Sequence, residues 1–160
     1  AWVNRPEHGV FTGNIFTDGS QIGAMPELRR AGWSLVQTDS GGSLIAAAFG
    51  PVPVDACPGQ VARDGEDYAV CMASQLVMAL CVVHSDCSGT AGCAKGPRGA
   101  AVGPRNARAH LWSSFFAAHD QGYESVKVLA HATLQDVDAG RTSLRERAGN
   151  ALAGANAKQD

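Results

Sequence analysis

The order of the expected strands and helices predicts an α/β fold, in which a mixed β-sheet is flanked by helices. Three β-prone segments come first, and the second and third are joined by the hairpin signal DSGG at residues 39–42. Helical stretches then alternate with short apolar strands. Hairpins join antiparallel strands, whereas strands reached through a helix run parallel to one another. We therefore expect a five-stranded sheet with three antiparallel strands followed by two parallel strands.

Each expected element follows from a local pattern. Apolar, β-prone runs predict strands at residues 10–17, 31–38, 43–49, 81–85 and 125–130. Apolar residues at helical spacing predict helices at residues 64–80 and 106–119, and a final helix, weakened by Gly149 and Gly154, at residues 143–158. Turn-forming residues predict loops at 21–30, 88–104 and 136–140, of which the second is long enough to include one helical turn.

The composition fits a globular domain of ordinary size. The chain has 160 residues, of which 45% are hydrophobic and 18% are charged, so it can bury a core and is unlike a disordered tail. No apolar run approaches the roughly 20 residues that a membrane-spanning helix needs. The chain begins at Ala1 rather than Met and lacks the regions of a signal peptide. We expect one monomeric domain at residues 1–160, with its core at 10–158, that is a processed or excised segment of a longer chain.

A basic stretch lies between the fourth expected strand and the helix after it. The net charge of −2 gives the whole chain no attraction to nucleic acid. Between residues 87 and 119, however, four cations occur without any Asp or Glu: Lys95, Arg98, Arg105 and Arg108. This stretch is either a set of phosphate contacts or a solvated loop and helix face.

The five cysteines favour a reduced, intracellular setting. Their number is odd, and no two of them form a C-x-x-C pair. Cys71 and Cys81 lie in apolar runs and are interpreted as small core residues. Cys87 and Cys93 are close enough in sequence to contact one metal ion, but no second Cys/His pair completes a zinc site.

Three carboxylates form the candidate site. Asp18 and Asp86 each follow a short apolar strand, and Glu66 lies in the first turn of the long helix. If the two strands are parallel neighbours, both Asp side chains emerge at the same carboxyl edge of the sheet, where α/β sheets bind ligands. Clustered carboxylates suit Mg²⁺ or Mn²⁺. The alternative is that each acid only caps a turn or a helix end.

Short segments along the chain resemble the motifs of the ribonuclease H family. They are residues 15–20 (IFTDGS), 31–36 (AGWSLV), 66–70 (EDYAV), 84–87 (HSDC), 111–112 (LW), 126–131 (VKVLAH) and 149–150 (GN). Each segment alone is weak, but together they occur in the family's order over residues 10–158. The match is most similar in style to ribonuclease H domains of retroelement polyproteins.

The resemblance implies an endonuclease that hydrolyses the RNA strand of RNA/DNA hybrids by a two-metal mechanism. Asp18 would bridge two Mg²⁺ or Mn²⁺ ions, and Glu66 and Asp86 would complete the site of one of them. His131 would move protons or help the product to leave. The candidate nucleic-acid-binding residues are Ser20, Arg63, Ser88, Lys95, Arg98, Arg105 and Arg108.

Two departures from the family pattern bear on this activity. The family places a fourth carboxylate where this chain has Gly154, so we expect the second metal site to be weakened unless Asp136 or Asp138 reaches it. The Asn and Gln residues with which the family contacts 2′-hydroxyl groups are also missing near Arg63 and Ser88. Trp112 is either a nucleic-acid contact or a buried core residue, as is common for Trp on a helix face.

Two other readings remain. The chain is alternatively a degenerate ribonuclease H-like domain that binds nucleic acid, or acts as a scaffold in a larger retroelement protein, without efficient cleavage; Gly154 motivates this reading. A third reading is an integrase-like strand transferase or a DNA nuclease. Glu66 near the middle of the chain argues against the integrase arrangement, in which the last acid lies on a late helix.

Overall fold

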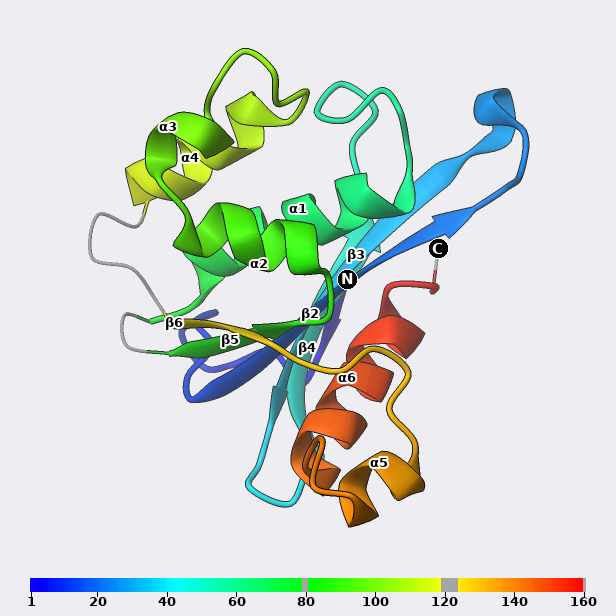
Figure 1. Cartoon of the computed structure of the whole chain (residues 1–160), viewed down its shortest axis with the longest axis vertical. Helices are drawn as coiled ribbons and strands as arrows, with labels where there is room; N and C mark the ends of the chain where they lie inside the picture. Colours follow the sequence, from blue (N-terminus) through cyan, green and yellow to red (C-terminus); the bar gives the residue numbers. More distant parts are fainter. Residues whose placement is uncertain (79–80, 119–123, 160) are drawn as a thin grey trace.

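In the computed structural model, which describes residues 1–78, 81–118 and 124–159, one mixed sheet carries helices on both faces (Figure 1). The strands are β1 (Trp2–Val3), β2 (Asn14–Ile22), β3 (Arg30–Thr38), β4 (Leu44–Pro51), β5 (Val82–Ser85) and β6 (Glu124–Lys127). The helices are α1 (Ala62–Leu76), α2 (Ser88–Lys95), α3 (Arg98–Ala101), α4 (Ala109–Ala118), α5 (Leu134–Asp138) and α6 (Leu144–Asn156), with a 3-10 turn at Pro26–Leu28.

The sheet topology confirms the predicted fold class. The strand order is β1-β4-β3-β2-β5-β6. The β2–β3 and β3–β4 pairs are antiparallel, whereas β5 pairs in parallel with β2 on one side and with β6 on the other. The structure adds β1, which pairs with the edge strand β4. Two residues are too few to show an alternating pattern, so the sequence offered no signal for this strand.

Two apolar clusters lie on the two faces of the sheet. On one face, α1 covers the strands that carry Ile15 and Leu35, and α4 packs against α1, where Trp112 is buried with only 1% of its surface exposed. Trp112 is therefore a core residue rather than a contact for nucleic acid. On the other face, α6 covers a smaller cluster that includes Phe16 and the neighbouring strand residues. Adjacent strand residues point to opposite faces, which is why Ile15 and Phe16 belong to different clusters.

Several elements have bounds that differ from the prediction, and the largest differences are in β2 and α1. β2 was expected to stop at Thr17 but continues to Ile22, since β3 pairs along its whole length, from Ile15 opposite Gln37 to Ile22 opposite Arg30. The turn signal around Asp18 is therefore part of a strand. α1 begins at Ala62 and ends at Leu76, earlier at both ends than expected. The expected ends of two helices, at residues 80 and 119, lie outside the described residues.

The expected loops at 88–104 and 136–140 were wrong in part. The first contains α2 and α3, separated at Gly96 and Pro97, because the alanines on either side of these two helix breakers are strong helix formers. The second overlaps α5, which begins after Thr133: the Thr133 hydroxyl accepts a hydrogen bond from the Asp136 N–H. α6 begins in the same way, with Ser143 accepting from the Glu146 N–H.

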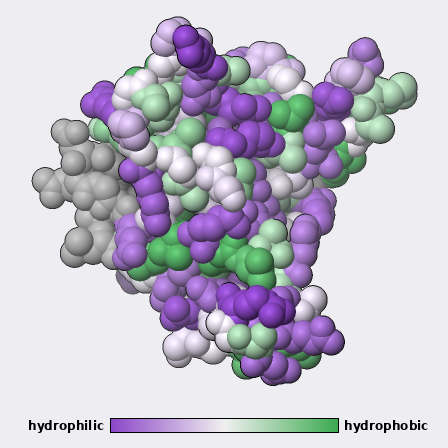
Figure 2. All heavy atoms as spheres, viewed as in Figure 1, coloured by the Kyte–Doolittle hydropathy of each residue, from purple (hydrophilic) through white to green (hydrophobic). Residues whose placement is uncertain are grey.

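The face of the molecule drawn in Figure 2 has a mostly polar surface. Hydrophilic residues cover most of this face, and hydrophobic residues form a band along β6 and the segment after it (Figure 2). Among the described residues, no helix is both long enough and apolar enough to cross a bilayer.

Candidate metal centre

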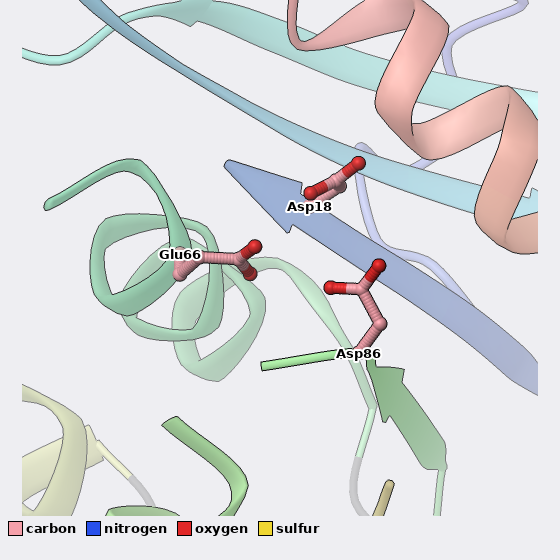
Figure 3. A group of neighbouring side chains, drawn as sticks. All are labelled: Asp18, Glu66 and Asp86. Carbon is pink, nitrogen blue, oxygen red and sulfur yellow. The ribbon is translucent and has the colours of Figure 1, made fainter. Parts of the chain in front are cut away.

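Three carboxyl groups converge from three separate elements. Asp18 comes from β2, Glu66 from the first turns of α1, and Asp86 directly follows β5 (Figure 3). One carboxylate oxygen from each lies within 4.8 Å of the others. The structure therefore brings together the three acids that the sequence singled out.

The parallel pairing of β2 and β5 explains why the two aspartates meet. Thr17 pairs with Ser85 at the end of their ladder, so Asp18 and Asp86 are the next residue on each strand. Because the strands run in the same direction, both carboxylates emerge at the same edge. The predicted geometry is confirmed, although Asp18 is internal to β2 rather than at its end.

Glu66 reaches the aspartates because two glycines let α1 approach β2 very closely. A Cβ atom at Gly19 would lie 2.1 Å from the Glu66 backbone nitrogen, and a Cβ atom at Gly65 would lie 2.3 Å from the Gly32 carbonyl oxygen. No side chain fits at either position. The residues flanking the two acids, Gly19 after Asp18 and Gly65 before Glu66, thus set the distance between them.

The cluster is electrostatically unfavourable without a cation. Burial, together with the charge of Asp18, raises the pKa of Glu66 well above its ordinary value. Burial and the charge of Asp86 likewise raise the pKa of Asp18. Oε2 of Glu66 is buried and has no hydrogen-bond partner among the described residues. An oxygen-binding divalent cation fits this donor set, because it would neutralise the repulsion and supply a partner for that oxygen.

A cavity of about 270 Å³ opens on the other side of the aspartates. Its lining is Asp18, Asp86, His131, Ala132, Arg147, Asn150, Ala151, Gly154, Ala155 and Lys158. His131, which the sequence placed after the last strand, thus reaches the same site from a backbone with a φ of 50°. The side-chain amide of Asn150 donates a hydrogen bond to Oδ2 of Asp86, at 3.0 Å.

Gly154 faces Asp18 directly. A Cβ atom at this position would lie 2.6 Å from Oδ2 of Asp18, so the residue where the family pattern has an acid does adjoin the cluster. Asp136 and Asp138, which the sequence suggested as substitutes for the missing fourth carboxylate, do not reach this position. Asp136 is held by Thr133 and Arg141, whose hydrogen bonds lower its pKa to about 2, and neither Asp136 nor Asp138 lines the cavity.

The candidate nucleic-acid residues fall into two groups. Three of them make internal contacts: Ser20 donates to the Ala157 carbonyl oxygen, Arg63 pairs with Asp67 at 2.8 Å, and Arg108 pairs with Asp64 at 2.5 Å. The other four are exposed on α2, α3 and the segment after them: Ser88, Lys95, Arg98 and Arg105. Of the predicted set, these four are exposed, whereas Ser20 is buried and Arg63 and Arg108 are partly exposed.

Sequence reasoning did not select three polar residues that line the cavity, which are Arg147 and Asn150 of α6 and Lys158 just after its end. They follow three- and four-residue spacing with Gly154, which is the spacing of one helix face. That spacing was visible in the sequence. It did not point to a site, because polar residues at this spacing are typical of any solvated helix face.

Comparison with known proteins identifies the fold. No protein-family profile and no curated protein sequence matches the chain. Solved structures do match it, and ribonuclease H domains are among them. The chain therefore has a ribonuclease H-like fold.

The similar structures include domains of retroviral type. A foamy virus (PFV) RNase H domain is 21% identical, with a TM-score of 0.69 over 96% of each chain. The foamy viral protease-reverse transcriptase in complex with RNA/DNA hybrid is 14% identical, with a TM-score of 0.65; the match covers 94% of this chain but 20% of that one. LC9-RNase H1, a type 1 RNase H with the type 2 active-site motif, is 15% identical, with a TM-score of 0.55 over 92% of this chain and 86% of that one.

Proposed function

We propose that this chain is a metal-dependent endonuclease that hydrolyses the RNA strand of RNA/DNA hybrids. The observation that carries the proposal is the convergence of Asp18, Glu66 and Asp86 within 4.8 Å, at the carboxyl edge of the β2–β5 pair. A ribonuclease H-like fold supports a nuclease reading of this cluster. The similarity of the chain to a protease-reverse transcriptase whose structure contains an RNA/DNA hybrid supports the choice of substrate.

The three carboxylates would hold Mg²⁺ or Mn²⁺. A divalent ion bound there supplies Lewis-acid stabilisation of a phosphodiester under attack by water. The chain's own groups would orient this site: Asn150 fixes Asp86 through its 3.0 Å hydrogen bond, and His131 lies at the rim of the cavity, where a proton can be exchanged with solvent. The expected second ion has weaker support, since Gly154 offers no ligand.

Cleavage of a labelled hybrid tests the proposal. We expect the purified protein to cut the RNA strand in the presence of Mg²⁺ or Mn²⁺ and to be inactive in EDTA. Asp18→Asn should lower the rate by at least about 1000-fold, because it removes a ligand charge from the centre of the cluster. The exposed Glu27→Gln is the matched control for loss of one carboxylate charge and should retain full activity. A wild-type protein that leaves the hybrid intact with both metals would refute the proposal.

A second candidate function is a degenerate domain that binds nucleic acid without efficient turnover. Gly154 next to Asp18 favours it, because the cluster then has three carboxylates rather than four. Tight, salt-dependent binding of the hybrid without cleavage would support this reading. Gly154→Asp separates the two functions further: a large gain of activity would indicate that the natural site lacks a metal ligand. The Asp18 carboxylate that the new side chain meets is a side-chain end and can rotate to admit it.

A further inference from the structure

The cavity beside the metal centre has two walls of opposite charge. Asp18 and Asp86 form the acidic wall, on the sheet. The wall on the side of α6 contains Arg147 and Lys158 and, among the described residues that line the cavity, no acid. A cavity built only to hold cations would not carry two positive side chains on one side. The asymmetry fits a ligand that is itself an anion and lies between a bound cation and the α6 wall.

The two cations of this wall differ in their availability. Arg147 is half-buried, and its Nε donates a hydrogen bond to the Ala132 carbonyl oxygen at 3.1 Å, which ties α6 to the segment carrying His131. Lys158 is exposed and forms no salt bridge with any other described residue. Its charge nevertheless reaches Asp18: burial and Asp86 raise the pKa of Asp18, and Lys158 opposes that rise. Lys158 is therefore the cation of this wall that can meet a ligand.

Two serines hold the end of α6 against the sheet next to Asp18. The Ser20 hydroxyl donates to the carbonyl oxygen of Ala157, the residue before Lys158. The Ser34 hydroxyl donates to the carbonyl oxygen of Ala153, at 2.7 Å. Ser20 is two residues after Asp18 on β2, so the two side chains point to the same face of the strand. These bonds fix the backbone of the turn that carries Lys158, while its long side chain remains free to adjust.

We propose that Lys158 is a catalytic residue that contacts a substrate phosphodiester group lying beside the three carboxylates, supplying positive charge on the α6 side of the cavity. This inference rests on the proposed function. An ammonium group is a compact point charge that binds phosphate oxygens well. It stabilises the negative charge on the phosphate oxygens where Gly154 leaves no ligand for a second ion. Lys158 would then supply, from the chain itself, positive charge on the side of the cavity where a second ion was expected.

The test compares Lys158→Gln, Lys158→Arg and the matched control Arg5→Gln. Arg5 is exposed and follows β1, which β4 and β3 separate from β2, and it stacks on Trp2 instead of facing the site. At saturating hybrid, Lys158→Gln should lower the cleavage rate by about 100-fold, the size expected for loss of one transition-state donor. Lys158→Arg should recover most of the rate, and Arg5→Gln should match the wild type.

Two further measurements do not depend on catalysis. With Ca²⁺ in place of Mg²⁺, the salt dependence of hybrid binding should fall by about one unit of slope in Lys158→Gln and stay unchanged in Arg5→Gln. Titration with Mn²⁺, followed by electron paramagnetic resonance, should give one ion per wild-type chain. In addition, Gly154→Asp should not raise the cleavage rate, because its carboxylate would pair with Lys158 one helical turn away.

The outcomes distinguish this role from the proposed function itself. If the wild-type protein cleaves the hybrid but Lys158→Gln behaves as Arg5→Gln does, the role of Lys158 is wrong and the nuclease stands. Two Mn²⁺ ions on the wild-type chain also overturn it. If the wild-type protein neither binds nor cleaves the hybrid, the proposed function and the role of Lys158 fail together.

Discussion

At the scale of single residues, the most consequential side chain is Glu66. It is 8% exposed, it faces the charges of two aspartates, and its Oε2 lacks a partner among the described residues. A carboxyl group in such a position holds a proton that a solvated glutamate would release. The pKa of Asp18 is raised as well, although this side chain is less buried than that of Glu66. The site is thus arranged at a cost in stability that a bound cation would remove.

This arrangement predicts a pH dependence for the metal-free protein. The pKa of Glu66 is raised in the folded state from its ordinary value of 4.5. The folded chain then binds more protons than the unfolded chain above that pH, so the contribution of Glu66 to stability falls as the pH rises. Glu66→Gln removes this loss. In EDTA, its melting temperature should exceed that of the wild type by about 3 °C or more at pH 8, corresponding to at least about 1 kcal/mol.

The difference in melting temperature should shrink as the pH falls toward 4.5 and vanish only below that pH, where the wild-type carboxyl group is protonated in the unfolded state as well. Glu27→Gln, at an exposed position, is the control and should show no such trend. A melting temperature of Glu66→Gln below that of the wild type throughout this range would contradict the assignment of Glu66 as a destabilised buried acid.

At the scale of elements, the site depends on how closely helices approach the sheet. α1 meets β2 at Gly65 and Gly19, and α6 meets it at Gly149, where a Cβ atom would lie 2.3 Å from the Phe16 ring. Such close packing requires glycines. The two that lie within helices, Gly65 and Gly149, each weaken their helix by about 1 kcal/mol relative to Ala. The glycines that made the last helix look weak in sequence are thus the residues that let it lie against the sheet.

Gly65→Ala tests the role of this close approach. The added methyl group meets the Gly32 carbonyl oxygen, which is a backbone atom and cannot rotate away. α1 must therefore shift outward, and this shift moves Glu66 away from Asp18. We expect Mn²⁺ affinity, measured by calorimetry, to fall at least about tenfold, with a loss of about 1–3 kcal/mol in stability.

Gly92→Ala in α2 is the matched control, since nothing lies within 4 Å of its added Cβ atom. It should leave Mn²⁺ affinity unchanged and raise stability by up to about 1 kcal/mol, because Ala is the better helix former. Equal Mn²⁺ affinity in Gly65→Ala and the wild type would show that the helix-to-strand distance does not set the geometry of the cluster.

At the scale of the whole molecule, the three-carboxylate cluster joins elements that are far apart in the sequence. A cation held by Asp18, Glu66 and Asp86 links β2, α1 and the segment after β5 in the folded state, but finds no such site in the unfolded chain. The same strands are covered by α6 on the opposite face. Binding at this point should therefore stabilise the molecule as a unit.

Addition of Mn²⁺ or Mg²⁺ should raise the melting temperature. At a free concentration of 100 times the dissociation constant, the gain is about 2.7 kcal/mol, or about 8 °C for a chain of this size. Differential scanning calorimetry should show the rise in the wild type, its reversal by EDTA and its absence in Asp18→Asn. An equal rise in Asp18→Asn would place the bound ion somewhere other than this cluster.

The order of the longer elements, the mixed sheet and the position of two of the three acids at one sheet edge could be predicted from the sequence, whereas β1, α2, α3 and α5 could not. Those conclusions rest on periodicity, turn residues and strand direction, which are local properties. The tertiary structure alone decided how far Glu66 lies from Asp18, and which side chains of α6 face the cavity. It also decided that Arg63 and Arg108, which are partly exposed, pair with buried aspartates. These features depend on the distances between packed elements, and no local pattern specifies such distances.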